Sequence, residues 1–180
     1  MNAEPILAKI AKALHDCRLD VILVGNAAAA LQGAPVTTLD FDFMFRNTPL
    51  NLKKLRKFAS AFGMLLSQPY YPVSDLYRLV NNETGLQLDF MSVLHRVKSF
   101  EALRSGASEV HFRGASLRVA DLKDVINSKR ALGRKKDLAV LQILEETLRE
   151  KEREEGNKEN SQAKKQKGSS RGTKERIGTR

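Results

Sequence analysis

The chain has few of the residues on which several protein classes depend. Its 180 residues include one cysteine, Cys17, and no tryptophan. A single cysteine excludes an intramolecular disulfide and a cysteine-built zinc site, and it suits a reducing compartment. No apolar run reaches the roughly 18 residues of a transmembrane helix, and the apolar N-terminal stretch is interrupted by Glu4 and Asp16, unlike the core of a signal peptide. We therefore expect a cytoplasmic protein with no membrane partner.

Length and charge divide the chain into a domain and a tail. A hydrophobic fraction of 42% over 180 residues suffices for one modest core, which we assign to residues 1–150. The formal net charge is +10, and it is concentrated near the C-terminus, where residues 158–180 are rich in Lys and Arg. We expect residues 151–180 to form a basic disordered tail, because they offer little apolar surface to bury. Such a tail either contacts the phosphates of a nucleic acid or serves only as a solvated extension, and the composition leaves both open.

Hydrophobic spacing predicts an α+β fold. Apolar residues three and four positions apart predict helices, whereas alternation and short apolar runs predict strands. The expected helices span 4–17, 27–31, 49–62, 100–104, 121–131 and 134–149. The expected strands span 19–24, 39–45, 75–80, 86–91, 109–112 and 116–119. Hydrophobic residues disappear from about Glu150, where we expect order to end.

Three aspartates on predicted strands are the main candidates for chemistry. Asp40 and Asp42 alternate with apolar residues of the 39–45 strand, so both project from one face while Leu39, Phe41, Phe43 and Phe45 share the other. Asp89 lies between two apolar residues of the 86–91 strand and projects in the same way. Three like charges together favour a hard cation such as Mg²⁺ or Mn²⁺. The alternative is that they are solvated residues of an outer face, and an Asp-x-Asp pattern alone does not decide between the two.

A glycine turn precedes these aspartates. Gly25 and Asn26 stand where a predicted strand turns into a helix, and a glycine there allows backbone N–H groups to approach a phosphate closely. Taken singly, such a glycine is also compatible with an ordinary turn. A phosphate-binding turn beside a carboxylate cluster would suit phosphoryl chemistry.

These segments resemble a known family. Residues 21–33, VILVGNAAAALQG, followed by 38–43, TLDFDF, resemble the first motif of the polymerase-beta-like nucleotidyltransferase superfamily, in the small prokaryotic branch that includes AbiEii- and MenT-type toxins. Residues 119–138, VADLKDVINSKRALGRKKDL, are similar to its later motifs. The resemblance implies a nucleotidyltransferase fold, in which helices flank a small mixed β-sheet and further helices precede the tail.

The resemblance also implies an activity and a set of site residues. The expected reaction moves a nucleoside monophosphate group from a nucleoside triphosphate to a hydroxyl acceptor. Asp40 and Asp42 would bind the catalytic metals, and Asp89 would bind metal and activate the acceptor.

Four further residues would bind the nucleotide: Gly25, Asn26, Lys129 and Asp137. Asn26 departs from the family pattern, which has Ser or Gly there. Lys129 and Asp137 also admit simpler interpretations, as a solvated helix residue and as a favourable first-turn charge. Arg134, Lys135 and Lys136 are interpreted as a phosphate-attracting surface.

Three hypotheses remain open for the acceptor. The first is transfer RNA or another RNA in a toxin–antitoxin setting with a cognate antitoxin, favoured by the basic tail and by the basic face of the 49–62 helix (Lys53, Lys54, Arg56 and Lys57). The second is a small hydroxylated molecule, as in antibiotic-modifying members of the superfamily. The third is a catalytically silent nucleotide- or RNA-binding module, which the unusual Asn26 keeps open.

Overall fold

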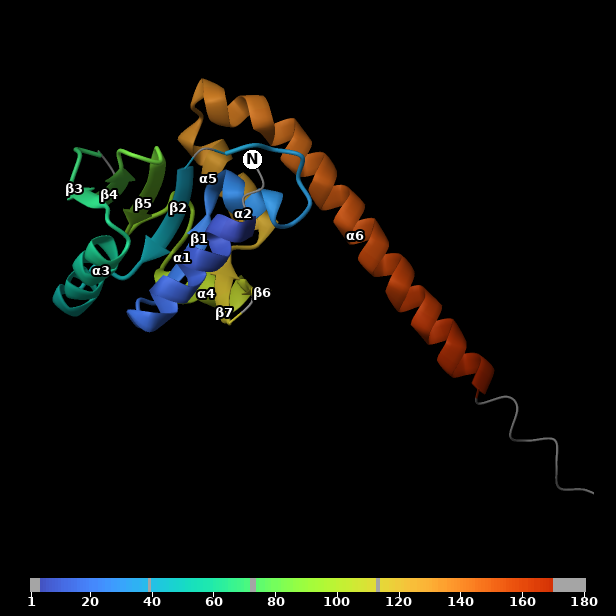
Figure 1. Ribbon diagram of the computed structural model, residues 1–180. Coiled ribbons are helices and arrows are strands. Elements are labelled where there is room, and N and C mark those ends of the chain that lie inside the picture. The colour runs from blue at the N-terminus through green and yellow to red at the C-terminus, as the bar shows by residue number, and fades with distance from the viewer. Residues whose placement is uncertain (1–3, 39, 72–73, 113, 170–180) are drawn as a thin grey trace, which may run out of the picture. The chain divides into compact units, whose positions relative to one another are not determined.

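The computed structural model describes residues 4–38, 40–71, 74–112 and 114–169 (Figure 1). It divides into two units, Met1–Leu144 and Glu145–Arg180. The first unit contains the sheet and the candidate site, and the second contains the distal part of the last helix.

A mixed β-sheet forms the centre of the first unit. Its order is β3-β4-β5-β2-β1-β7-β6. The strands are β1 (Val21–Val24), β2 (Asp40–Phe45), β3 (Leu65–Ser67), β4 (Leu76–Asn81), β5 (Leu86–Met91), β6 (Ser108–Phe112) and β7 (Ala115–Val119). The β1–β7 and β2–β5 pairs are parallel and the remaining pairs are antiparallel. The mixed α+β architecture expected from the sequence is confirmed.

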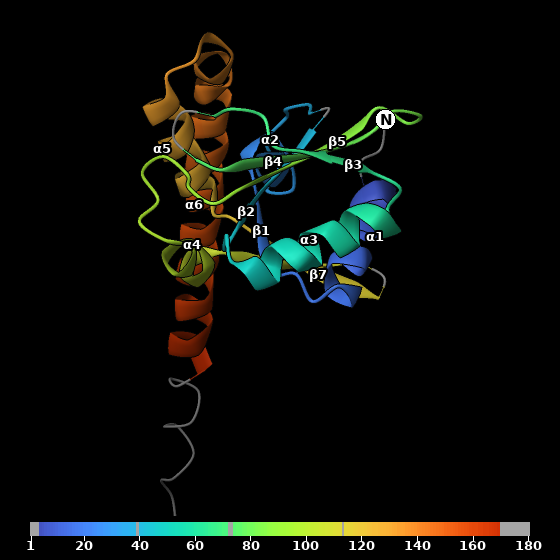
Figure 2. The same ribbon diagram turned by 90° about the vertical axis from the view of Figure 1, so that its left-hand side faces the viewer.

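Helices of the first unit pack around this sheet (Figures 1 and 2). They are α1 (Glu4–Asp16), α2 (Gly25–Ala30), α3 (Pro49–Ala61), α4 (Phe100–Gly106) and α5 (Leu122–Leu132). The last helix, α6 (Lys135–Ser169), begins in the first unit and continues into the second. Helix α1 contacts β7 and α3, whereas α2 contacts β1, β2 and α5. Local signals explain several boundaries: the side chains of Thr48, Ser99 and Asp121 accept hydrogen bonds from backbone N–H groups at the starts of α3, α4 and α5. Gly133 ends α5 in the left-handed conformation.

An aromatic cluster fixes which face of the sheet is the core. Phe43 of β2 stacks on Phe90 of β5 with ring centroids 5.0 Å apart, and Phe58 of α3 packs edge-on against Phe90 at 6.0 Å. Successive side chains of a strand alternate between faces. The α3-covered face is therefore the aromatic one, and the neighbouring aspartates project from the opposite face.

Two details differ from the sequence-based expectations, and one expected residue lies outside the described part of the chain. Met44, which alternation places with the aspartates, is only 2% exposed, because β2 is an interior strand and only its Asp40–Asp42 end borders a cavity. Strand β3 was not predicted, since it has three residues and its Leu65 is 67% exposed at the sheet edge. Leu39, predicted to begin the aromatic face, lies outside the described residues.

The last helix is longer than predicted. We expected order to end near residue 150, but α6 continues to Ser169. The physical reason is its composition, since Glu, Lys, Arg, Gln and Ala are good helix formers and no proline interrupts them. Pairs four residues apart add to this, as between Arg149 and Glu145 at 3.7 Å. Residues 170–180 of the predicted tail lie outside the described part of the chain. In that described part, no helix combines the length and apolar character needed to cross a bilayer.

Candidate active site

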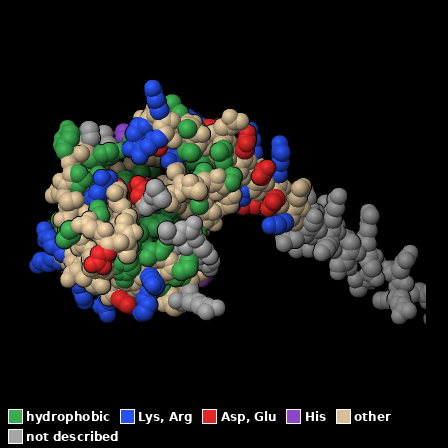
Figure 3. All heavy atoms as spheres, turned by 45° about the horizontal axis from the view of Figure 1, so that its top comes forward, with side chains coloured by type: hydrophobic (Ala, Val, Ile, Leu, Met, Phe, Trp, Pro, Cys, Tyr) green, Lys and Arg blue, Asp and Glu red, His purple; other side chains and the backbone are tan. Residues whose placement is uncertain are grey.

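Asp40, Asp42 and Asp89 converge on one cavity of the first unit. The first two project from β2, and Asp89 lies directly beside Asp42 in the parallel register of β2 and β5. One carboxylate oxygen from each lies within 4.8 Å of the others. The expected convergence of these side chains is therefore confirmed. In the space-filling view, acidic side chains lie in a hollow bordered by Lys and Arg (Figure 3).

Asp42 carries the electrostatic cost of the cluster. Burial, and then the charges of Asp40 and Asp89, raise the pKa of Asp42 to about 7. A bound cation would remove this cost, because it favours the ionised carboxylates. The donor set consists of carboxylate oxygens, which Mg²⁺ and Mn²⁺ prefer. The residues present thus fit a divalent metal.

Arg78 also neutralises part of the cluster, and sequence reasoning missed it. This residue lies opposite Asp89 in the β4–β5 hairpin. Its Nε and Nη2 donate to the two Asp89 carboxylate oxygens at 2.8 and 2.7 Å, and Gln87 donates to one of them at 3.3 Å. Asp89 is 5% exposed, so its charge is buried but paired. The predicted hairpin was a signal, but the pairing depends on its register, in which Asn81 lies opposite Leu86.

Gly25 brings the start of α2 against Asp42. Val24 pairs with Asp42 across β1 and β2, and the next residue, Gly25, has φ of +68°. A Cβ at Gly25 would lie 3.2 Å from Asp42 Cγ and would collide with the Asp42 carboxylate oxygen Oδ2. Only glycine satisfies both the backbone conformation and this close approach. The turn expected at this position is present, and phosphate binding by it stays a prediction.

Asn26 places an amide beside the turn. Its Oδ1 is buried and has no hydrogen-bond partner among the described residues. Buried polar atoms normally have a partner, so this one indicates a ligand or water position. The amide of Asn offers both an acceptor and a donor end, and either can face the cavity after a flip.

A cationic wall lies on the other side of the cavity. The Lys129 Nζ donates to Asp137 Oδ1 at 3.2 Å, and Arg134 Nε donates to Asp137 Oδ2 at 2.5 Å. Lys129 is 9% exposed, which excludes its interpretation as a solvated helix residue. Asp137 is 2% exposed and lies in the first turn of α6, so its interpretation as a favourable first-turn charge still holds. Burial alone would raise the pKa of Asp137, but the hydrogen bonds from Arg134 and Lys129 lower it below its usual value. Lys136 also lines this cavity.

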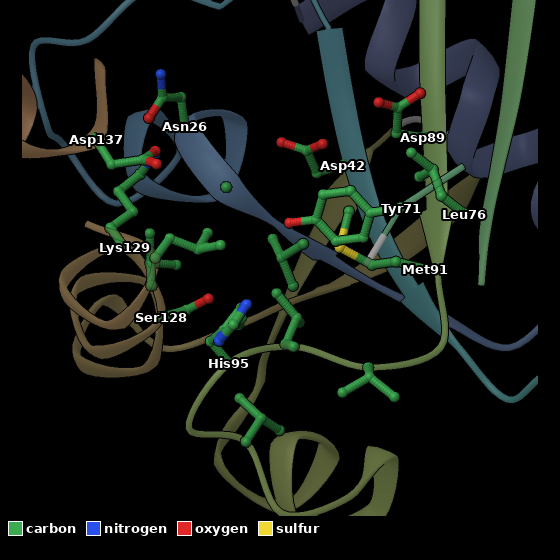
Figure 4. A pocket seen from close by; sticks show the side chains of 18 of the residues that line it. Asn26, Asp42, Tyr71, Leu76, Asp89, Met91, His95, Ser128, Lys129 and Asp137 are labelled. Atoms are coloured by element: carbon green, nitrogen blue, oxygen red, sulfur yellow. The ribbon is translucent and has the colours of Figure 1, made fainter. Parts of the chain in front are cut away.

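The cavity continues from the charged groups into an apolar end. Its volume is about 340 Å³, within the range of small-molecule and cofactor sites. We use the name apolar end for the part of the cavity next to α4, α5 and the loop between β5 and α4, which contribute Leu94, Val97, Leu103 and Val125 to the lining. Figure 4 shows Asp42 near the middle, with Asp89 on one side and Lys129, Ser128 and His95 on the other. Sequence reasoning gave Ser128 and His95 no role, since neither belongs to a recognisable spacing.

The basic face predicted on α3 lies outside this cavity. Lys53, Arg56 and Lys57 are exposed and do not line it. The buried side of α3 packs on the aromatic face of the sheet through Phe58, whereas the aspartates project from the opposite face. The structure therefore separates this basic surface from the carboxylate cluster.

Comparison with known proteins identifies the fold. No family model and no curated protein matches the sequence. Among solved structures, a proposed nucleotidyltransferase of Thermotoga maritima is 19% identical with a TM-score of 0.57, over 77% of this chain and 89% of that one. The lincosamide antibiotic adenylyltransferase LnuA, bound to lincomycin, is 12% identical with a TM-score of 0.57, over 79% and 96%.

A third similar structure is ANT(2″)-Ia in complex with adenylyl-2″-tobramycin. It is 14% identical with a TM-score of 0.57, over 82% of this chain and 90% of that one. At these identities the likeness establishes the fold alone. The chain thus has the fold of the nucleotidyltransferases, as its motifs indicated, and the narrower resemblance to AbiEii- and MenT-type toxins stays a prediction.

Proposed function

We propose that the chain transfers a nucleotidyl group from a nucleoside triphosphate to a hydroxyl acceptor. The observation that carries this proposal is the close set of three carboxylates, within 4.8 Å of one another, in a cavity that also has a cationic wall. Phosphoryl transfer requires these two features, because the triphosphate is highly charged and its reacting atoms must be held in line. The nucleotidyltransferase fold supports the same reaction.

Asp40, Asp42 and Asp89 would hold the divalent metal. A bound Mg²⁺ or Mn²⁺ would neutralise phosphate charge and act as a Lewis acid. Asp42 would bind the metal directly, and the lack of a side chain at Gly25 allows the start of α2 to lie against its carboxylate. The proposal therefore assigns Gly25 to close packing of the turn and Asn26 to a hydrogen bond with the triphosphate.

Lys129 and Arg134 would bind the phosphates that leave. Both side chains donate to Asp137, and each retains further donors, since Lys has three and Arg has five. Asp137 is an anion, so its part in nucleotide binding would be to position these cations rather than to touch phosphate. Because Asp137 already holds these two cations in place, they could stabilise the negative charge that develops on the phosphates without moving during the reaction.

Asp89 would orient or deprotonate the acceptor hydroxyl. Its carboxylate lies at the β5 side of the cluster, where Arg78 keeps it in one orientation. A general base must reach the proton that it accepts. The acceptor is therefore expected to enter from the β4–β5 side of the cavity.

The acceptor is a small hydroxylated molecule or an RNA. The small molecule is supported by similar structures that contain lincomycin or adenylylated tobramycin, and by the position of the basic α3 face away from the carboxylates. Transfer RNA, in a toxin setting with an antitoxin, is the second candidate. It is supported by the net charge of +10.

Label transfer separates these acceptors. Each nucleoside triphosphate, labelled at the α-phosphate, would be incubated with the full chain and Mg²⁺ or Mn²⁺, with either total RNA or a panel of hydroxylated antibiotics. We expect label in one acceptor class and none with Asp42→Asn, while Asp16→Asn, which changes an exposed aspartate, stays active. No transfer to any acceptor, with intact nucleotide binding, would favour a catalytically silent binding module.

A further inference from the structure

Helix α5 presents two kinds of groups to the cavity along one face. Val125, Ser128, Lys129 and Leu132 all line the cavity, and their spacing of three and four residues places them on one side of a helix. Lys129 belongs to the cationic wall, and Ser128 is its immediate neighbour. A ligand lying along α5 would therefore meet a cation first and then an apolar surface that carries one hydroxyl.

The Ser128 hydroxyl is an unused hydrogen-bonding group in a nearly closed environment. Ser128 is 6% exposed, and its side chain has no hydrogen-bond partner among the described residues. The hydroxyl oxygen itself is not fully buried, so it borders the cavity, where a ligand could form a hydrogen bond with it. Figure 4 shows its oxygen directed into the cavity, on the side of His95.

His95 supplies a second polar group to the same region. It lies in the loop between β5 and α4, and Figure 4 shows its ring reaching into the cavity below Ser128. The imidazole likewise has no side-chain partner among the residues that the structure describes. Apolar lining residues come from the same segments: Leu94 and Val97 belong to the loop that carries His95, and Val125 precedes Ser128 by three residues on α5.

We infer that this end of the cavity binds the nucleobase of the donor nucleotide, with Ser128 and His95 as the residues that select the base. The inference rests on the proposed function and adds a substrate determinant to it. A base is a flat apolar ring with a polar edge, which suits apolar walls that carry a few directed hydrogen-bonding groups.

The arrangement favours the donor nucleotide over the acceptor as the occupant. A nucleoside triphosphate carries its charged phosphates at one end and its base at the other. On α5, Lys129 could meet the phosphates and the neighbouring Ser128 could meet the base. The acceptor hydroxyl must instead reach Asp89, which Figure 4 shows on the opposite side of Asp42 from Ser128. The base therefore belongs on the α5 side, and the acceptor belongs on the β5 side.

Calorimetric binding to the full chain with Mg²⁺ tests this inference in the absence of any acceptor. The probes are ATP, GTP, CTP, UTP and inorganic tripolyphosphate, which lacks a base. The variants are Ser128→Ala and His95→Ala, and the matched controls are Ser60→Ala and His111→Ala, which change exposed residues. A third variant, Val97→Phe, fills the apolar end from the loop without removing a polar group.

We expect the wild type to bind the four nucleotides with different affinities. In each polar variant the difference in affinity between the preferred nucleotide and the others should be smaller. Loss of one neutral hydrogen bond should weaken the preferred nucleotide about threefold to tenfold, with tripolyphosphate binding unchanged. Val97→Phe should weaken all four nucleotides and spare tripolyphosphate. The controls should match the wild type, and thermal melting should confirm that each variant is folded.

Two results would overturn the inference while the proposed function stands. The first is that both polar variants bind the four nucleotides with the same relative affinities as the wild type. The second is that the variants lose tripolyphosphate binding as much as they lose nucleotide binding. Absence of binding by every probe to the wild-type protein would overturn the proposed function together with the inference.

Discussion

Arg78 and Asp89 face each other across the β4–β5 hairpin and are joined by two hydrogen bonds of 2.8 and 2.7 Å. Asp89 is buried, and Arg78 has a side chain that is 37% exposed. The pair fixes the orientation of the carboxylate that is proposed to meet the acceptor. The positive charge of Arg78, on the neighbouring strand β4, also neutralises part of the negative charge of the three carboxylates.

Arg78→Ala should destabilise the protein by about 1–3 kcal/mol, because it leaves a buried carboxylate unpaired and Arg78 itself is only partly buried. The double variant Arg78→Ala/Asp89→Asn should recover most of that loss, since no buried charge then lacks a partner. Urea denaturation of the two single variants and the double variant measures this coupling. Equal stability of the double variant and Arg78→Ala would show that the pair does not hold Asp89 as described.

Asp42→Asn should raise the stability of the metal-free protein in a pH-dependent manner. The pKa of Asp42 is about 7 in the folded protein against an ordinary value of 3.8, so the folded state binds a proton that the unfolded state releases. Folding stability of the wild type therefore decreases as the pH rises through this window and levels off above it. The asparagine variant lacks this decrease.

Thermal melting without metal tests the prediction for Asp42. The variant should match the wild type near about pH 4 and exceed it by roughly 1–3 kcal/mol near about pH 8. Asp16→Asn, at an exposed site, should give no such increase at high pH. An Asp42→Asn variant that is less stable than the wild type at high pH would contradict the described charge repulsion.

Gly25→Ala should abolish nucleotidyl transfer and destabilise the protein. The new methyl group would be forced against the Asp42 carboxylate, and the residue would also have to keep a positive φ. Gly33→Ala is the matched control, because Gly33 has φ of +96° but a Cβ there meets nothing within 4 Å. Both variants share the backbone strain, so only Gly25→Ala should lose metal-dependent activity. Equal residual activity in the two variants would show that the close approach of Gly25 to Asp42 does not explain the loss of transfer.

Sequence reasoning predicted the parts of the site that depend on local pattern. Alternation along 39–45 and 86–91 was sufficient to place Asp40, Asp42 and Asp89 on one face, because strand geometry fixes side-chain direction. Arg78 could not be assigned in the same way. Its contact with Asp89 depends on the hairpin register, which a shift of one residue would change.

The polar groups at the apolar end could not be predicted from the sequence. Ser128 and His95 are far apart in the chain, and only the packing of the β5–α4 loop near α5 brings both to one cavity. The length of α6 was missed for another reason. Loss of hydrophobic residues was interpreted as loss of order, although helix propensity and pairs four residues apart can extend a helix without a core.

Removal of residues after Glu155 should leave the melting temperature of the protein nearly unchanged, since this segment offers no apolar face to the core. Far-ultraviolet circular dichroism should nevertheless lose helical signal, because α6 extends to Ser169. If RNA is the acceptor, truncation should also weaken RNA binding and flatten its salt dependence by about 0.7–0.9 in the log–log slope for each lost phosphate contact. Unchanged affinity and slope would count against the tail as an RNA-binding element and favour the small-molecule acceptor.

The central claim is that the carboxylate cluster transfers a nucleotidyl group rather than a terminal phosphate. The most direct measurement compares nucleoside triphosphates labelled at the α-phosphate and at the γ-phosphate, with the same acceptor and divalent metal. The account predicts that α-label enters the acceptor, that γ-label is released as pyrophosphate, and that Asp42→Asn does neither. Transfer of the γ-label to the acceptor, or undiminished α-label transfer by Asp42→Asn, would contradict it.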